Sequence, residues 1–189
     1  NWAQLGPFVK RKTDVGLRRA SEPLFHSMPS RETTIPKWIH RLFKVTKMLS
    51  IWSLGMMYTF VGFRHFSDPD FFIQIMPPTL PFPKELILFT GGWEIFNGIL
   101  LLFGKTRRLA AISTGILLIV VFPANIYLAL YETPQLALDV TQAQALRRVP
   151  FQLTLLFLAF WHARQENTFN ENIFASVLFY PTILYFLSL

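Results

Sequence analysis

Long apolar runs alternate with short charged segments along most of this chain. Four such runs lie at 48–63, 86–103, 109–131 and 149–163. About 20 apolar residues form a helix that crosses the ~30 Å hydrocarbon core of a membrane, and Lys or Arg side chains at the ends extend a shorter run. The pattern therefore predicts an all-α membrane protein, with a four-helix transmembrane bundle at 37–164.

A fifth apolar run follows at 172–189 and contains Pro181. Its length suits a C-terminal hydrophobic helix that either crosses the membrane or lies along a partner, and we assign 165–189 to it. The segment at 1–36 has no sustained apolar period, which predicts an extended basic N-terminal arm. The basic residues of the arm are Lys10, Arg11, Lys12, Arg18, Arg19 and Arg31.

Composition supports a membrane protein. Hydrophobic residues make up 52% of the chain and charged residues only 15%, and the mean hydropathy is +0.36. The chain has no Cys, which excludes disulfides, thiolate metal sites and dithiol redox chemistry within it. The net charge of +7 resides in cations before and between apolar runs rather than on one soluble face. We therefore expect phospholipid and other membrane-protein subunits as partners, and no nucleic acid.

The basic residues also predict an orientation. If the helices alternate in direction, the side that collects more Lys and Arg faces inward. The richer side holds Lys37, Arg41, Lys44, Lys47, Lys105, Arg107, Arg108 and Arg164, and the other holds Arg64, Lys84, Arg147 and Arg148. The chain begins at Asn1 rather than Met, which fits either a transit peptide removed in the mitochondrial matrix or a record that starts late. We favour the mitochondrial inner membrane with the N-terminus in the matrix; the alternative is a bacterial cytoplasmic membrane with the N-terminus in the cytoplasm.

One carboxylate interrupts the second apolar run. Counted from Lys84, Glu94 lies about 15 Å along its helix, near the middle of a membrane. Thr90 and Asn97 share its face, at i−4 and i+3. An ionised Glu at this depth costs at least ~2.5 kcal/mol, so the carboxyl should be protonated or paired. Arg148, Arg64 and His65 are the cations at a suitable depth.

The same depth count gathers a polar cluster in the outer half of the membrane. Its predicted members are His65, Glu94, Asn125, Arg148 and Gln152, with Arg64, Thr90 and Asn97 as secondary polar residues. Asn125 would also replace a backbone hydrogen bond that Pro123 removes. No second His or carboxylate stands at ligand spacing beside His65, so we expect neither a metal nor haem. We assign no catalytic residue, because a buried ionisable pair is more often a helix clamp than an acid catalyst.

The order of these residues resembles a known family. The stretches are "GFRHF", "DPDFFIQIMPPTLPFPKELI", "GGWEIFNG", "RRLAAISTG", "VFPANIYLA" and "RRVPFQ". In this order they resemble the DoxX-like family of small four-helix membrane proteins, from about the first apolar run to Trp161. The resemblance implies that the family's recurrent His, Glu, Asn, Arg and Gln fall on the five cluster residues. It also implies association with membrane oxidoreductases.

Two classes of function remain open. A non-catalytic accessory subunit would dock its bundle in a larger membrane oxidoreductase or respiratory-chain complex and grip its neighbours through the arm and the C-terminal helix. A quinone- or lipid-binding oxidoreductase component would instead use a polar pocket in the outer half of the membrane. There Glu94 and His65 would handle protons, and bound lipid or quinone would be the only ligand. The long basic arm favours the accessory subunit, because a self-contained enzyme has little use for it.

Overall fold

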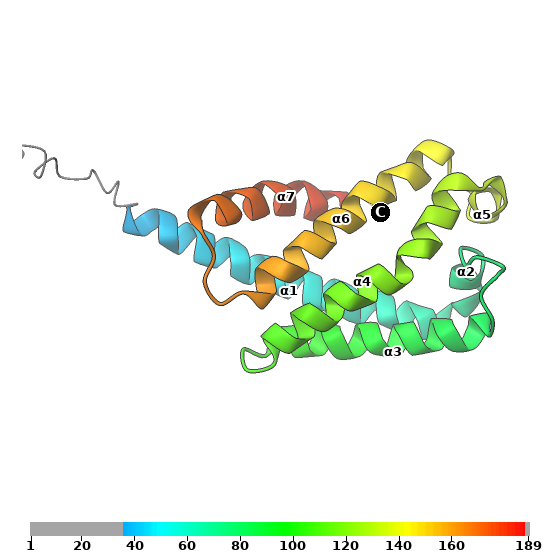
Figure 1. The fold of residues 1–189 in the computed structure, drawn as a ribbon, viewed down its shortest axis with the longest axis horizontal. Coiled ribbons are helices and arrows are strands. Elements are labelled where there is room, and N and C mark those ends of the chain that lie inside the picture. The colour runs from blue at the N-terminus through cyan, green and yellow to red at the C-terminus, as the bar shows by residue number, and fades with distance from the viewer. Residues whose placement is uncertain (1–35, 188–189) are drawn as a thin grey trace, which may run out of the picture. The chain divides into compact units, whose positions relative to one another are not determined.

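The computed structural model describes residues 36–187, and each regular element in this range is an α-helix (Figure 1). The helices, in chain order, are α1 (Lys37–Ser67), α2 (Pro69–Ile73), α3 (Pro83–Leu102), α4 (Arg107–Leu130), α5 (Glu132–Ala137), α6 (Gln142–Ala163) and α7 (Phe169–Leu187). The long helices α1, α3, α4, α6 and α7 overlap the five apolar runs, so the predicted all-α class is confirmed for the described residues. The predicted arm at 1–36 lies outside them, apart from Pro36.

Two helices of the described range, α3 and α4, are long and apolar enough to cross a membrane by length and composition. Both α1 and α6 begin well before their apolar runs. The early start of α6 has a local cause. Thr141 Oγ1 accepts a hydrogen bond from the Gln144 N–H (3.3 Å), and the Gln144 side chain accepts one from the Thr141 N–H (2.8 Å). This capping box satisfies two donors that a helix start otherwise leaves unpaired.

Glycines bring α1 and α3 into backbone contact. A Cβ added at Gly62 would lie 2.6 Å from the Gly91 carbonyl oxygen, and one at Gly98 would lie 2.6 Å from that of Gly55. Gly55 and Gly62 are seven residues apart on α1, and Gly91 and Gly98 are seven residues apart on α3. The two contacts therefore lie two turns apart along one seam between antiparallel helices. Small residues at such a seam permit the close approach, which increases dispersion contacts between the helices.

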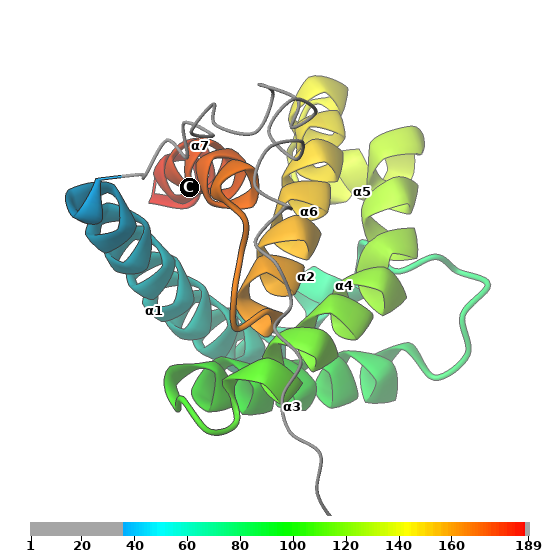
Figure 2. The same ribbon diagram turned by 60° about the vertical axis from the view of Figure 1, so that its left-hand side comes forward.

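The core is built where α4, α6 and α7 meet α1 and α3. Leu101 and Leu158 are almost fully buried there, as are Ala175 and Phe179 of α7. Figure 2 shows α7 in the space between α1 and α6, and it packs against both. The C-terminal segment therefore belongs to the same compact unit as the four long helices before it, and this unit begins at Pro36.

Two short helices, which the apolar pattern did not predict, lie at the end of the bundle where α1 finishes. α2 packs against α3, and α5 connects α4 to α6 (Figure 1). Between α2 and α3 runs the proline-rich loop at 77–83. It ends at Phe82, which has a left-handed backbone (φ 53°), and Pro83 then begins α3. Proline suits this first helical position because its missing N–H would be unpaired there anyway.

The opposite end of the bundle is held together by Lys47. Its Nζ donates to the Arg164 carbonyl oxygen (2.8 Å) and to Asn167 Oδ1 (2.6 Å), and it lies 5.4 Å from the ring centroid of Trp161. Hydrogen bonds and a cation–π contact thus tie α1 to the segment that joins α6 to α7.

A second capping box begins α7. Thr168 Oγ1 accepts from the Glu171 N–H (3.3 Å), and the Glu171 carboxylate accepts from the Thr168 N–H (2.9 Å) and pairs with Arg164. The hydrogen bond from the Thr168 backbone lowers the pKa of the Glu171 carboxyl, and Arg164 acts in the same direction.

Candidate functional site

The structure brings His65 of α1 and Glu94 of α3 together at the end of the glycine seam formed by Gly62 and Gly91. Nε2 of His65 lies 3.6 Å from Oε2 of Glu94, and both side chains are buried. On the other side of the ring, Nδ1 is 3.0 Å from the Ile87 carbonyl oxygen and 3.4 Å from the Thr90 hydroxyl. A carbonyl only accepts, so Nδ1 carries a proton and donates it.

That assignment determines what the pair does chemically. With its proton on Nδ1, a neutral His65 presents the lone pair of Nε2 to the Glu94 carboxyl. One further proton can reside on Nε2, which gives an ion pair, or on the Glu94 carboxyl, which leaves both groups neutral. A neutral pair with the proton on Glu94 avoids charge in an apolar interior, which is the cheaper arrangement there. The 3.6 Å separation of Nε2 and Oε2 is longer than a hydrogen bond, so the two groups form a close polar contact in this structure.

The surroundings of this pair are closed by protein. A Cβ added at Gly91 would lie 2.4 Å from the His65 Cβ, so α1 and α3 leave no gap at the pair. The Phe72 ring of α2 covers the imidazole, with ring centroids 3.7 Å apart. Glu94 Oε2 and the hydroxyl of Tyr58 are buried without a hydrogen-bond partner among the described residues.

The other predicted amides form a separate group between α4 and α6. Asn125 Nδ2 donates to Gln152 Oε1 (2.6 Å), and Gln152 Nε2 donates to the Leu118 carbonyl oxygen (2.7 Å). Leu118 lies one residue before Ile119, whose carbonyl would have bonded the N–H that Pro123 lacks. The expectation that Asn125 would repair the kink is therefore wrong in its detail, because Gln152 reaches the backbone and Asn125 holds Gln152.

Asn97 faces α4 rather than the pair. It is fully buried, and in the orientation that its neighbours require its Nδ2 donates to Ser113 Oγ (2.9 Å) while its Oδ1 accepts from Trp93 Nε1 (3.2 Å). Trp93 Nε1 also lies 2.7 Å from Ser113 Oγ. This group joins α3 to α4 by side-chain hydrogen bonds across helices, and such bonds stabilise membrane helix pairs.

The two predicted arginines do not join the pair. Arg148 is half-buried in α6 and makes no ion pair with an acidic residue of the described range. Arg64 lies exposed and pairs with Asp68, with an N–O distance of 3.5 Å. The expectation of one polar cluster that includes an arginine is thus not met. The reason is the packing order: α3 packs most closely on α1, and α6 packs most closely on α4.

Several buried polar residues were not singled out from the sequence. His162 of α6 lies 3.0 Å from Ser50 of α1, from Nε2 to Oγ, and Thr46 Oγ1 lies 3.2 Å from the Tyr180 hydroxyl. Thr46, Ser50 and Tyr58 share one face of α1 at spacings that are multiples of four. That regular spacing of polar residues was a readable signal for the inward face of α1.

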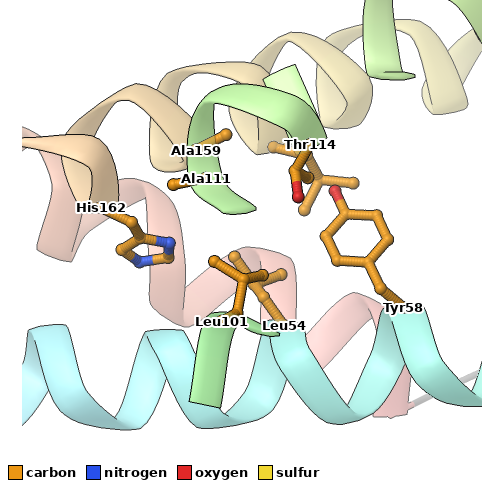
Figure 3. Close-up of a pocket in the computed structure, with 8 residues that line it drawn as sticks. Leu54, Tyr58, Leu101, Ala111, Thr114, Ala159 and His162 are labelled. Carbon is orange, nitrogen blue, oxygen red and sulfur yellow. The ribbon is translucent and has the colours of Figure 1, made fainter. Parts of the chain in front are cut away.

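The interior beside these residues holds no ligand cavity. Figure 3 shows Tyr58 reaching toward Thr114 of α4, while His162 lies on the far side of Leu54 and Leu101. The space enclosed by these side chains has no room for a water molecule. Within residues 36–187, no three His, Asp or Glu side chains gather in a way that could hold a metal ion.

A larger hollow lies on the outward-facing surface of α3. It has a volume of about 450 Å³ and is mostly apolar. It is lined by Leu88, Phe89, Gly92, Trp93 and Phe96.

A family model described as a domain of unknown function (DUF8561) matches residues 54–163, from the middle of α1 to the end of α6. No curated protein and no solved structure matches the chain.

Proposed function

The chain belongs to the DUF8561 family, whose description assigns no chemistry, and we propose from the geometry that it is a non-catalytic accessory subunit of a larger membrane complex. One observation carries the proposal. The buried polar groups are mostly hydrogen-bonded to one another or to backbone, and the space enclosed between Tyr58, Thr114 and His162 has no room for a water molecule. Such groups act as interhelical clamps.

The outward surface supports a membrane location for the whole bundle. Each long helix exposes large apolar side chains, for example Phe60 (65%), Phe89 (64%), Ile119 (57%), Phe160 (52%) and Val177 (62%). Contiguous apolar surface of this extent is unfavourable in water and favourable in lipid. We therefore propose that α1, α6 and α7 cross the membrane together with α3 and α4.

The charge distribution supports an orientation. The start of α1, the α3–α4 turn and the α6–α7 segment lie at the same end of the described bundle (Figure 1). The basic residues at this end are Lys37, Arg41, Lys44, Lys47, Lys105, Arg107, Arg108 and Arg164. By the positive-inside rule this end faces the mitochondrial matrix, or the cytoplasm in a bacterium.

The kind of complex is proposed from the resemblance to DoxX-like proteins, which implies association with membrane oxidoreductases such as those of a respiratory chain. Two parts of the chain are available to hold neighbours. The arm at 1–36 is basic, and the outward face of α7 is apolar, with Phe174 and Leu184 exposed. Basic side chains suit acidic partner surfaces, and an apolar helix face suits a neighbouring transmembrane helix.

Deletion of residues 1–36 tests the proposal. The intact protein should migrate in a high-mass assembly on a native gel of gently solubilised membranes, and the truncated protein should leave that assembly while staying in the membrane. A variant with the six arm cations replaced by Gln, at full length, separates the role of charge from that of chain length. The accessory role is wrong if the intact protein runs alone as a small particle, or if the truncated protein still migrates with the complex.

A quinone- or lipid-binding role is the second candidate, and the hollow on α3 favours it. Its volume of about 450 Å³ lies in the range of small-molecule sites, and its apolar walls suit an isoprenoid or acyl tail. Co-purified quinone or lipid that is lost in Gly92→Phe, which fills the hollow, would support this role over the first.

A further inference from the structure

The first turns of α1 carry two stripes of different character. Figure 1 shows this part of α1 extending beyond the other helices. Lys37, Arg41 and Lys44, at i, i+4 and i+7, form one exposed basic stripe. Trp38, Leu42 and Val45 have the same spacing and form a neighbouring apolar stripe, with side chains 65%, 52% and 55% exposed. A helix with basic and apolar stripes side by side suits the boundary between headgroups and acyl chains.

A second basic group stands beside this segment. Gly55 faces Gly98 and Gly62 faces Gly91 along the antiparallel seam. By that register Leu102, the last residue of α3, is level with Ile51, and the α3–α4 turn that carries Lys105 follows it at the same end of the bundle as the start of α1 (Figure 1). Lys105 and Arg108 are exposed, and a Cβ added at the neighbouring Gly104 would meet no atom within 4 Å.

None of these five cations has an acidic partner in the described range. The ion pairs there involve Arg64, His65 and Arg164. The acidic residues near this end are Glu166 and Glu171, and Glu171 already pairs with Arg164. At the opposite end, the basic residues are accompanied by Asp68, Asp70, Glu85, Glu132 and Asp139. Among residues 36–187, positive charge without an acidic partner is thus concentrated at one end of the bundle.

We propose that the basic stripe of α1 and the α3–α4 turn form a binding surface for anionic phospholipid headgroups. The cations bind the headgroup phosphates, and the stripe of Trp38, Leu42 and Val45 packs against the upper part of the acyl chains. The apolar stripe distinguishes a lipid from a soluble anion, which would leave these side chains in water. The inference rests on the proposed membrane location and is independent of the accessory role.

Fluorescence quenching by brominated lipids tests this surface. The full-length protein in neutral detergent is titrated with brominated phosphatidylglycerol and, separately, with brominated phosphatidylcholine. Wild type should be quenched at lower concentrations of the anionic lipid. Replacing Lys37, Arg41 and Lys44 together by Gln should weaken the anionic-lipid binding about tenfold or more, since each basic residue near a membrane surface contributes about 1 kcal/mol and about 1.4 kcal/mol is tenfold.

A matched triple variant provides the control. Arg64→Gln, Lys84→Gln and Arg147→Gln remove the same charge from the opposite end and should leave the lipid preference unchanged. Trp38→Phe should reduce the quenching by bound anionic lipid, which places the lipid at this stripe.

Two results would overturn the proposal. The first is an equal lipid preference in wild type and in the α1 variant. It would indicate that these cations bind an acidic protein surface instead of lipid. The second is displacement of the lipid by the same concentration of inorganic phosphate, which would show a simple anion site. Neither result bears on the accessory role, since that is read from the mass of the native assembly.

Discussion

Gln152 illustrates at the residue scale how one polar side chain can hold two helices. It accepts a hydrogen bond from Asn125 and donates one to the Leu118 backbone, so both ends of its amide are used. The backbone carbonyls near Pro123 lie where the regular helix ladder is interrupted, and an unpaired carbonyl in an apolar environment is costly. The side chain therefore links α6 to Asn125 of α4 and to the α4 backbone one turn before Pro123.

We expect Gln152→Leu to lower the stability of the bundle by about 1 kcal/mol, which is within the range of interhelical hydrogen bonds in membranes. Thr154→Val is a matched control in the same helix, because the Thr154 hydroxyl bonds only the Pro150 carbonyl one turn earlier. Thermal unfolding in detergent compares them. A melting temperature equally lowered in the two variants would contradict the role assigned to Gln152.

At the scale of the helix pair, contact between α1 and α3 depends on glycine. Gly91→Ala would place a Cβ 2.4 Å from the His65 Cβ and 3.0 Å from the Gly62 carbonyl oxygen. The helices would have to separate, and overpacking of this kind costs about 1–3 kcal/mol. We expect a clear loss of thermal stability, together with a weaker His65–Glu94 contact.

The neighbouring Gly92 offers a control, because Gly92→Ala adds the same methyl group to the same helix. A Cβ at Gly92 would meet only the Phe66 ring, at 3.9 Å, which is ordinary van der Waals contact. Gly92→Ala should therefore melt at the wild-type temperature or slightly above it, because Ala favours a helix over Gly. Equal melting temperatures for Gly91→Ala and Gly92→Ala would contradict the close contact of α1 and α3 at Gly91.

At the scale of the whole molecule, the proposed five crossings predict which loops share a side. The chain has no Cys, so single cysteines introduced by mutation can be labelled without background. Gly104→Cys lies in the α3–α4 turn and should be labelled from the inner side, and Thr79→Cys in the proline-rich loop from the outer side. A Cys added after Leu189 should be labelled from the outer side if α7 crosses. Labelling of that Cys from the same side as Gly104→Cys would show that α7 does not cross.

The long helices could be predicted from the apolar runs, because burial of backbone in an apolar environment requires helix or closed barrel, and the runs have helical lengths. The starts of α6 and α7 were also readable, since Thr141 and Thr168 each precede Gln or Glu by three residues, which is the spacing of a capping box. The short helices α2 and α5 gave no such signal. They have only five and six residues, which is too short for an apolar run of membrane-spanning length, and they pack on α3 and on α4 and α6 respectively.

The sequence by itself determined the position of each polar side chain along its helix, because that position follows from the rise per residue. Only the tertiary structure decided which of them meet. Glu94 lies against His65 because four glycines draw α3 onto α1, whereas Arg148 is carried on α6, which packs on α4. Rotation and neighbour order come from packing between helices, and the periodicity of one helix holds no information about either.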